Sequence, residues 1–131
     1  MWPPMPGLMR LARTTIAITN YHVISQLIWE AEEYTPLAFL SDGSTRPVTL
    51  MGVDTVHDLA LVEIQGADVP LFRFRTAPLA KGMRLYALGN PFDLGLTIIE
   101  GTHSGLVEHS FYQKLHFSGS VNPGMSGGPV V

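Results

Sequence analysis

The chain has 131 residues, a formal net charge of −3 at pH 7 and no cysteine. This length allows one compact domain or two very small subdomains. The slightly negative charge provides no basic field for nucleic acid or for an anionic lipid surface. Without cysteine, the chain has no disulfide scaffold, no cysteine-ligated zinc and no cysteine nucleophile.

The composition favours short strands joined by tight turns. The chain contains 13 glycines and 10 prolines, and only 15% of its residues are charged; the usual charged share is about 25%. An apolar fraction of 46% argues against disorder, because disordered chains contain few apolar residues.

Residues 1–13 read MWPPMPGLMRLAR and are expected to be an N-terminal extension. They lack the basic start and the unbroken apolar core of a signal peptide. No stretch of the chain has the length and hydropathy of a membrane span, so none is expected.

Strand signals dominate from residue 14 onward, as short apolar or alternating runs bounded by turn residues. The expected strands are residues 14–19, 37–40, 47–53, 59–64, 71–75, 83–88, 96–100 and 111–117. Asp42-Gly43 lies between the second and third of these runs and predicts a hairpin. One helix is expected, over residues 23–33, because apolar residues recur there at helical spacing.

Strands at this spacing, with turn signals between them, predict an all-β barrel or sandwich. Turn residues cluster around residues 76–78. We therefore expect one unit over residues 14–76 and a second over residues 77–131.

The segment Gly124-Met125-Ser126-Gly127-Gly128 is a candidate nucleophile loop. A serine between glycines can project from a tight turn whose N–H groups remain free to bind an oxyanion. A plain glycine–serine turn has the same composition. The nucleophile elbow of α/β-hydrolases also fits the pattern, but those enzymes place the carboxylate and the histidine after the serine, where this chain has only five residues. Partners of Ser126 must therefore lie upstream.

Five histidines compete for the role of general base: His22, His57, His103, His109 and His116. A serine hydroxyl needs an imidazole to take its proton, and His22 directly follows a predicted strand that could aim it. Glu100-x-x-His103 could suggest a metal site, but the helix that would align two such ligands is absent.

A carboxylate is needed to orient the histidine and to stabilise its protonated form. Asp58 begins an apolar run and could point from a strand edge into a cleft. Asp54 fits better as the turn residue that ends the preceding strand. The sequence favours Asp58.

Five segments together resemble chymotrypsin-fold serine peptidases, and specifically their bacterial HtrA/Deg-like branch. In order, they are TNYHVI at 19–24, FLSDGSTRPVTLMGVD at 39–54, HDLALVEI at 57–64, LYALGNPFDLGLTIIEGTHSGLV at 85–107 and SVNPGMSGGPVV at 120–131. Carried over by position, the family's catalytic residues fall on His22, Asp58 and Ser126. The oxyanion hole would use the N–H groups of Gly124 and Ser126.

The resemblance implies a chymotrypsin-like double β-barrel whose second barrel is incomplete, in a chain that is truncated at both ends relative to the family. It implies a serine endopeptidase that hydrolyses protein substrates through an acyl-enzyme. The alternative is a catalytically incompetent chain that acts as a binding or partner module, or is simply a fragment. A metal-dependent hydrolase is a third and weaker alternative.

By family position, four uncharged residues would line the base of the S1 pocket: Ser118, Gly119, Ser120 and Val121. They favour small or medium apolar P1 side chains over lysine or arginine. This chemistry needs no cofactor and no metal, and we expect neither. Family members usually act on unfolded proteins outside the cytoplasm and often trimerise, so the resemblance implies a polypeptide partner, homo-oligomers and a bacterial periplasm or cell envelope.

Overall fold

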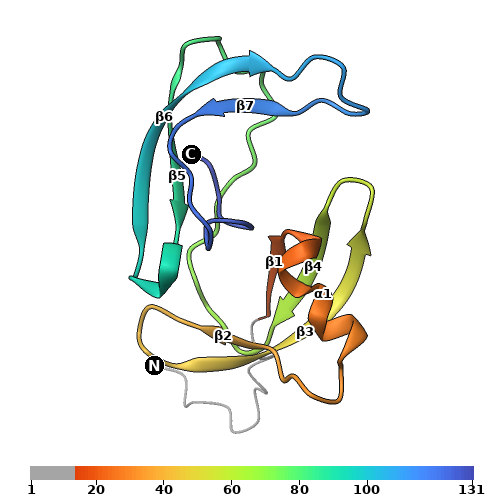
Figure 1. The fold of residues 1–131 in the computed structure, drawn as a ribbon. Coiled ribbons are helices and arrows are strands. Elements are labelled where there is room, and N and C mark those ends of the chain that lie inside the picture. The colour runs from red at the N-terminus through yellow and green to blue at the C-terminus, as the bar shows by residue number, and fades with distance from the viewer. Residues whose placement is uncertain (1–13) are drawn as a thin grey trace, which may run out of the picture.

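The computed structural model describes residues 14–131 as two antiparallel sheets joined by a long irregular connection (Figure 1). The first sheet has the order β1-β4-β3-β2 and the second has the order β5-β6-β7. The predicted all-β fold is confirmed. The expected extension over residues 1–13 lies outside the described residues.

The first sheet contains β1 (Thr15–Thr19), β2 (Leu37–Phe39), β3 (Thr45–Asp54) and β4 (Leu59–Ile64). The predicted hairpin joins β2 to β3, with Phe39 opposite Thr45. Its turn is closed by the Asp42 carboxylate, which accepts a hydrogen bond from the Ser44 N–H at 2.8 Å. A bulge at Leu50/Gly52 interrupts the pairing of β3 with β4, and such bulges bend a sheet.

The second sheet contains β5 (Arg84–Gly89), β6 (Thr97–Leu106) and β7 (Leu115–Ser118). A short 3-10 helix, η1 (Pro91–Asp93), lies between β5 and β6. The end of the chain returns along β5: the Leu88 N–H donates to the Pro129 carbonyl, and Tyr86 and Val131 exchange two backbone hydrogen bonds. This return positions the loop that carries Ser126.

The buried side chains of β4 and β5 lie on alternating positions, as the period of two predicts. Ala60 and Val62 of β4 are buried, as are Leu85 and Ala87 of β5. Helix α1 (Tyr21–Trp29) buries Ile24. No helix within the described part of the chain is both long and apolar enough to cross a membrane.

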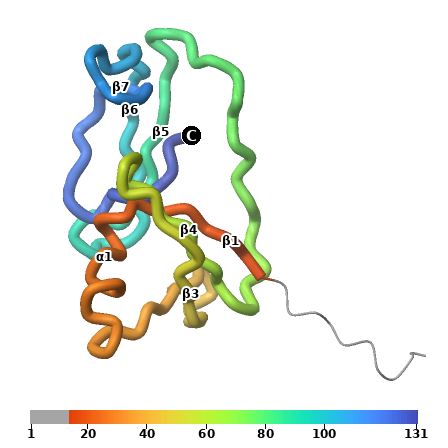
Figure 2. The backbone as a smooth tube through the Cα atoms, turned by 90° about the vertical axis from the view of Figure 1, so that its right-hand side faces the viewer, coloured from red at the N-terminus to blue at the C-terminus, as the bar shows by residue number. Residues whose placement is uncertain are grey.

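Three expectations about elements were wrong in part or whole. Residues 71–75 form no strand and belong to the irregular connection that Figure 2 shows running outside both sheets. A run of strand-forming residues needs a hydrogen-bonding partner, and this segment pairs with no described strand. The helix begins at Tyr21 and ends at Trp29 instead of covering residues 23–33. Of the predicted strand 111–117, only Leu115 onward is a strand.

Gly89→Ala should destabilise the fold, because Gly89 of β5 lies directly against the buried Met125. A Cβ at position 89 would lie 2.9 Å from the Met125 Cα, a backbone atom that cannot swing away. We expect the free energy of unfolding to fall by about 1–3 kcal/mol, measured by urea denaturation.

Gly52→Ala in β3 is the matched control, because a Cβ there meets nothing within 4 Å. Equal loss of stability in the two variants would contradict this account of Gly89.

Candidate active site

His22 and Asp58 meet because β1 and β4 are antiparallel neighbours. Thr19 at the end of β1 pairs with Ala60 at the start of β4, so the residues just after β1 lie beside those just before β4. The His22 Nδ1 lies 2.7 Å from the Asp58 Oδ2, and the His22 N–H donates to the Asp58 Oδ1 at 2.9 Å. Both carboxylate oxygens of Asp58 are thus engaged by one histidine.

Asp58 also caps the first turn of α1. The first N–H groups of a helix have no partner within it, and here the Tyr21 N–H donates to the Asp58 carbonyl at 3.1 Å while the His22 N–H donates to its carboxylate. Asn20 occupies the N-cap position, but its side chain makes no capping bond. A carboxylate at a helix N-terminus is further favoured by the helix dipole. His22 is therefore held at both its backbone and its ring.

The hydrogen bonds from His22, first from its backbone N–H and then from its ring, lower the pKa of the Asp58 carboxyl. An ionised carboxylate can only accept hydrogen bonds, so the Nδ1 of neutral His22, which faces Asp58, carries the ring proton. Its Nε2 is then the ring nitrogen left to accept a proton. The His22 and Asp58 side chains are 56% and 40% exposed, so both are open to solvent.

Asp54, the competing carboxylate, bonds within its own turn. Its Oδ1 accepts the N–H groups of Val56 and His57 at 3.0 and 3.1 Å, and its Oδ2 lies 2.6 Å from the His57 Nδ1. The side-chain bond from His57 is the main cause that lowers the pKa of Asp54. The carboxylate that meets His22 is Asp58 and not Asp54.

Ser126 lies exposed in a loop shaped by two glycines with positive φ, Gly124 (94°) and Gly127 (82°). A Cβ on Gly124 would lie 2.6 Å from the Asn90 carbonyl oxygen, so only glycine fits there. Within residues 14–131, the N–H groups of Gly124 and Ser126 donate to no other residue. Both remain available for a substrate oxygen.

Asn20 joins the Ser126 loop to Asp58, a role that the sequence did not reveal. Its Oδ1 accepts the Gly127 N–H at 2.6 Å, and its Nδ2 donates to the Asp58 carbonyl at 2.9 Å. Gly127 also packs so closely on the Thr19 hydroxyl that no Cβ would fit. The only sequence signal was the position of Asn20, two residues before His22 in TNYHVI; its partners lie 38 and 107 residues away.

Ser126 itself is not bonded to the His22–Asp58 pair. Among the described residues its hydroxyl makes no hydrogen bond, to His22 or to any other group. Catalytic hydrogen bonds are often long before substrate binds. The structure thus bonds His22 to Asp58 and joins Gly127, the neighbour of Ser126, to Asn20.

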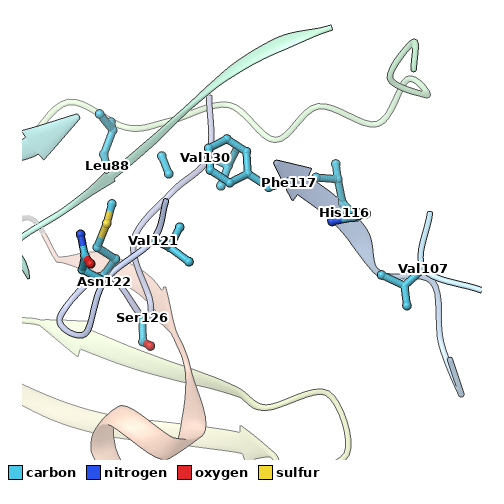
Figure 3. Close-up of a pocket in the computed structure, with 12 residues that line it drawn as sticks. Leu88, Val107, His116, Phe117, Val121, Asn122, Ser126 and Val130 are labelled. Carbon is cyan, nitrogen blue, oxygen red and sulfur yellow. The ribbon is translucent and has the colours of Figure 1, made fainter. Parts of the chain in front are cut away.

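An apolar hollow of about 430 Å³ lies on the second sheet next to Ser126 (Figure 3). Of the four predicted S1 residues, only Val121 lines it. The Ser118 hydroxyl bonds the Ser104 hydroxyl, and Gly119 lies against the Phe117 ring. Ser120 is exposed. Further apolar lining comes from Leu88, Val107, Leu115, Phe117 and Val130.

The Glu100-x-x-His103 pattern does not form a shared ligand pair. Glu100 is exposed on β6 and lies 3.2 Å from the Arg84 Nε, whereas His103 is buried. Positions three apart on a strand point to opposite faces. No group of three potential ligands gathers anywhere in residues 14–131.

Comparison with known families gives a single answer. The family model of the trypsin-like peptidase domain matches residues 9–131. The chain belongs to this family. The resemblance to the HtrA/Deg-like branch of trypsin-like peptidases is likewise confirmed by individual relatives.

A probable periplasmic serine endoprotease, DegP-like, of Pseudomonas fluorescens is 32% identical over 118 residues, which are 86% of this chain and 24% of that protein. The putative serine protease HhoB of Synechocystis is 29% identical, over 87% of this chain and 28% of that protein. This chain therefore spans about a quarter of the length of these relatives.

Solved structures agree with this assignment. The serine endoprotease from Yersinia pestis superposes with a TM-score of 0.75 at 28% identity, covering 88% of this chain and 40% of that one. Deg5 gives 0.71 at 26% identity, covering 87% and 62%. The predicted trypsin-like fold is confirmed by these neighbours.

The Asp58 carboxyl should titrate below its usual value of 3.8. Because the folded pKa is lowered, the ionised carboxylate stabilises the fold at higher pH, and this contribution disappears as pH falls through the folded pKa. The chemical shift of the Asp58 carboxyl carbon, followed by NMR from pH 6 to about pH 2, measures the midpoint.

In His22→Ala the ring hydrogen bond is lost, so the Asp58 midpoint should rise toward 3.8. A midpoint at or above 3.8 in the unmodified chain would show that the hydrogen bonds from His22 do not stabilise the ionised form.

Proposed function

We propose that this chain carries the catalytic centre of a serine endopeptidase, with His22, Asp58 and Ser126 as its triad. One observation carries the proposal: Asp58 holds His22 at ring and backbone, and the same Asn20 that bonds Asp58 also bonds the Ser126 loop. The family membership and the names of the relatives support it.

In the proposed reaction the Ser126 Oγ attacks the carbonyl carbon of a peptide bond, and the His22 Nε2 accepts the hydroxyl proton. Asp58 keeps the Nδ1 proton in place and stabilises the imidazolium. The oxyanion is bound by the N–H groups of Gly124 and Ser126. His22 then gives its proton to the departing amine, leaving an acyl-enzyme, which water hydrolyses by the same steps in reverse order.

The substrate is proposed to be polypeptide, unfolded protein included, with a small or medium apolar P1 side chain. The apolar hollow beside Ser126, with Val121 in its wall, supports an apolar preference. The names of the relatives support a bacterial periplasm. We also propose homo-oligomers, on the family resemblance alone.

The second candidate is a non-catalytic module that binds polypeptide without cleaving it. The observation that favours it is the Ser126 hydroxyl, which is not hydrogen-bonded to His22. Reactivity of that hydroxyl separates the two functions.

Exposure of the purified chain to a fluorophosphonate should give one adduct by intact mass, because His22 activates the Ser126 hydroxyl. Ser126→Ala should give none. A soluble, folded chain without an adduct would support the non-catalytic module.

Asp58→Asn should slow labelling by up to about 10⁴-fold, since the carboxylate then no longer sets the tautomer of His22. Asp54→Asn, the matched change in the same turn, should have a mild effect, because Asp54 makes no contact with His22. The reverse order of effects would move the catalytic carboxylate to Asp54.

A further inference from the structure

A second histidine–carboxylate pair lies directly beside the proposed triad. The Asp54 carboxylate holds the His57 ring at 2.6 Å and also accepts two backbone N–H groups of the same turn. His57 directly precedes Asp58. The φ of Asp58 is 55°, a value that is uncommon outside glycine. Asp58 thus directly follows a residue that Asp54 holds by both its backbone N–H and its ring.

The other half of the molecule contacts this pair through Tyr112. Tyr112 lies in the loop over residues 107–114 that joins β6 to β7. Its ring centroid is 4.5 Å from that of His57, with the planes tilted by 58°. The Lys114 Nζ lies over the same Tyr112 ring, 4.8 Å from its centroid. In Figure 1 the β3–β4 turn and the β6–β7 loop approach each other on one side of the molecule.

This contact bears on catalysis because the triad is divided between the two sheets. His22 and Asp58 belong to the first half, and Ser126 belongs to the second. The Asn20–Gly127 hydrogen bond ties the halves together beside Ser126. The Tyr112–His57 contact ties them together beside Asp58. Two contacts at separate points resist rotation of one half against the other, which one contact alone does not.

We propose that His57, held by Asp54, and Tyr112 are positioning residues that hold the Asp58 turn against the second half of the molecule. The proposal rests on the proposed function, because it assigns both residues to the reaction of Ser126. On this proposal, the loop over residues 107–114, which joins two strands of the second sheet, aligns the His22–Asp58 pair with Ser126.

The test uses Tyr112→Ala in the whole chain, with fluorophosphonate labelling followed at increasing reagent concentration. The maximal labelling rate should fall about 3- to 10-fold, the range expected from losing an aromatic pair. The half-saturating concentration should not change, since Tyr112 is absent from the hollow beside Ser126. Tyr112→Phe keeps the ring and should restore the rate.

Phe111→Ala is the matched control, because Phe111 precedes Tyr112 in the same loop and its side chain is fully exposed. It should label like the unmodified chain. His57→Ala should lose as much as Tyr112→Ala, and the double variant should lose no more than either. Unchanged labelling in Tyr112→Ala, or an equal loss in Phe111→Ala, would overturn the proposal.

A second readout does not depend on labelling. The NMR titration midpoint of Asp58 should rise in Tyr112→Ala and stay unchanged in Phe111→Ala, because a displaced Asp58 loses its hydrogen bonds to His22. Failure of the unmodified chain to label would refute the proposed function alone. An unchanged Asp58 midpoint in Tyr112→Ala would refute the positioning role alone.

Discussion

The meeting of Asp58 with the first turn of α1 is the constraint on which the candidate site depends. One residue caps two N–H groups of the helix and binds the ring of His22. Its carbonyl also accepts a hydrogen bond from the Asn20 side-chain amide, and the Oδ1 of that amide accepts one from the Gly127 N–H in the Ser126 loop. A change at Asp58 would therefore disturb the helix start, the histidine and the link to the serine together.

The sheets act mainly as a frame for three short segments. The first turn of α1, the β3–β4 turn and the loop after β7 carry every proposed catalytic group, much as binding and catalytic groups often lie on the connections of a rigid scaffold. Left-handed backbone at Asp58, Gly124 and Gly127 shapes two of these segments. Pairing of β1 with β4 brings His22 to Asp58, pairing of the chain end with β5 positions the Ser126 loop, and the Asn20–Gly127 hydrogen bond joins the two halves.

Contacts between the two halves at the site are small and specific. The Asn20–Gly127 hydrogen bond and the Tyr112–His57 ring contact involve few atoms, whereas large apolar side chains such as Phe72 and Phe74 remain 64% and 81% exposed. The placement of the Ser126 loop against the first half therefore depends on a few side chains.

The sequence by itself determined the all-β class, the hairpin at Asp42-Gly43 and the glycine-shaped turn around Ser126, because alternation, turn chemistry and glycine spacing are local properties. It also ranked Asp58 above Asp54 as the partner of His22. Only the tertiary structure decided that residues 71–75 lack a strand partner, that Asn20 joins Asp58 to Gly127, and that Tyr112 meets His57. These outcomes depend on groups far apart in the chain, which no local pattern encodes, and which meet only when each sheet is paired and the two halves contact each other.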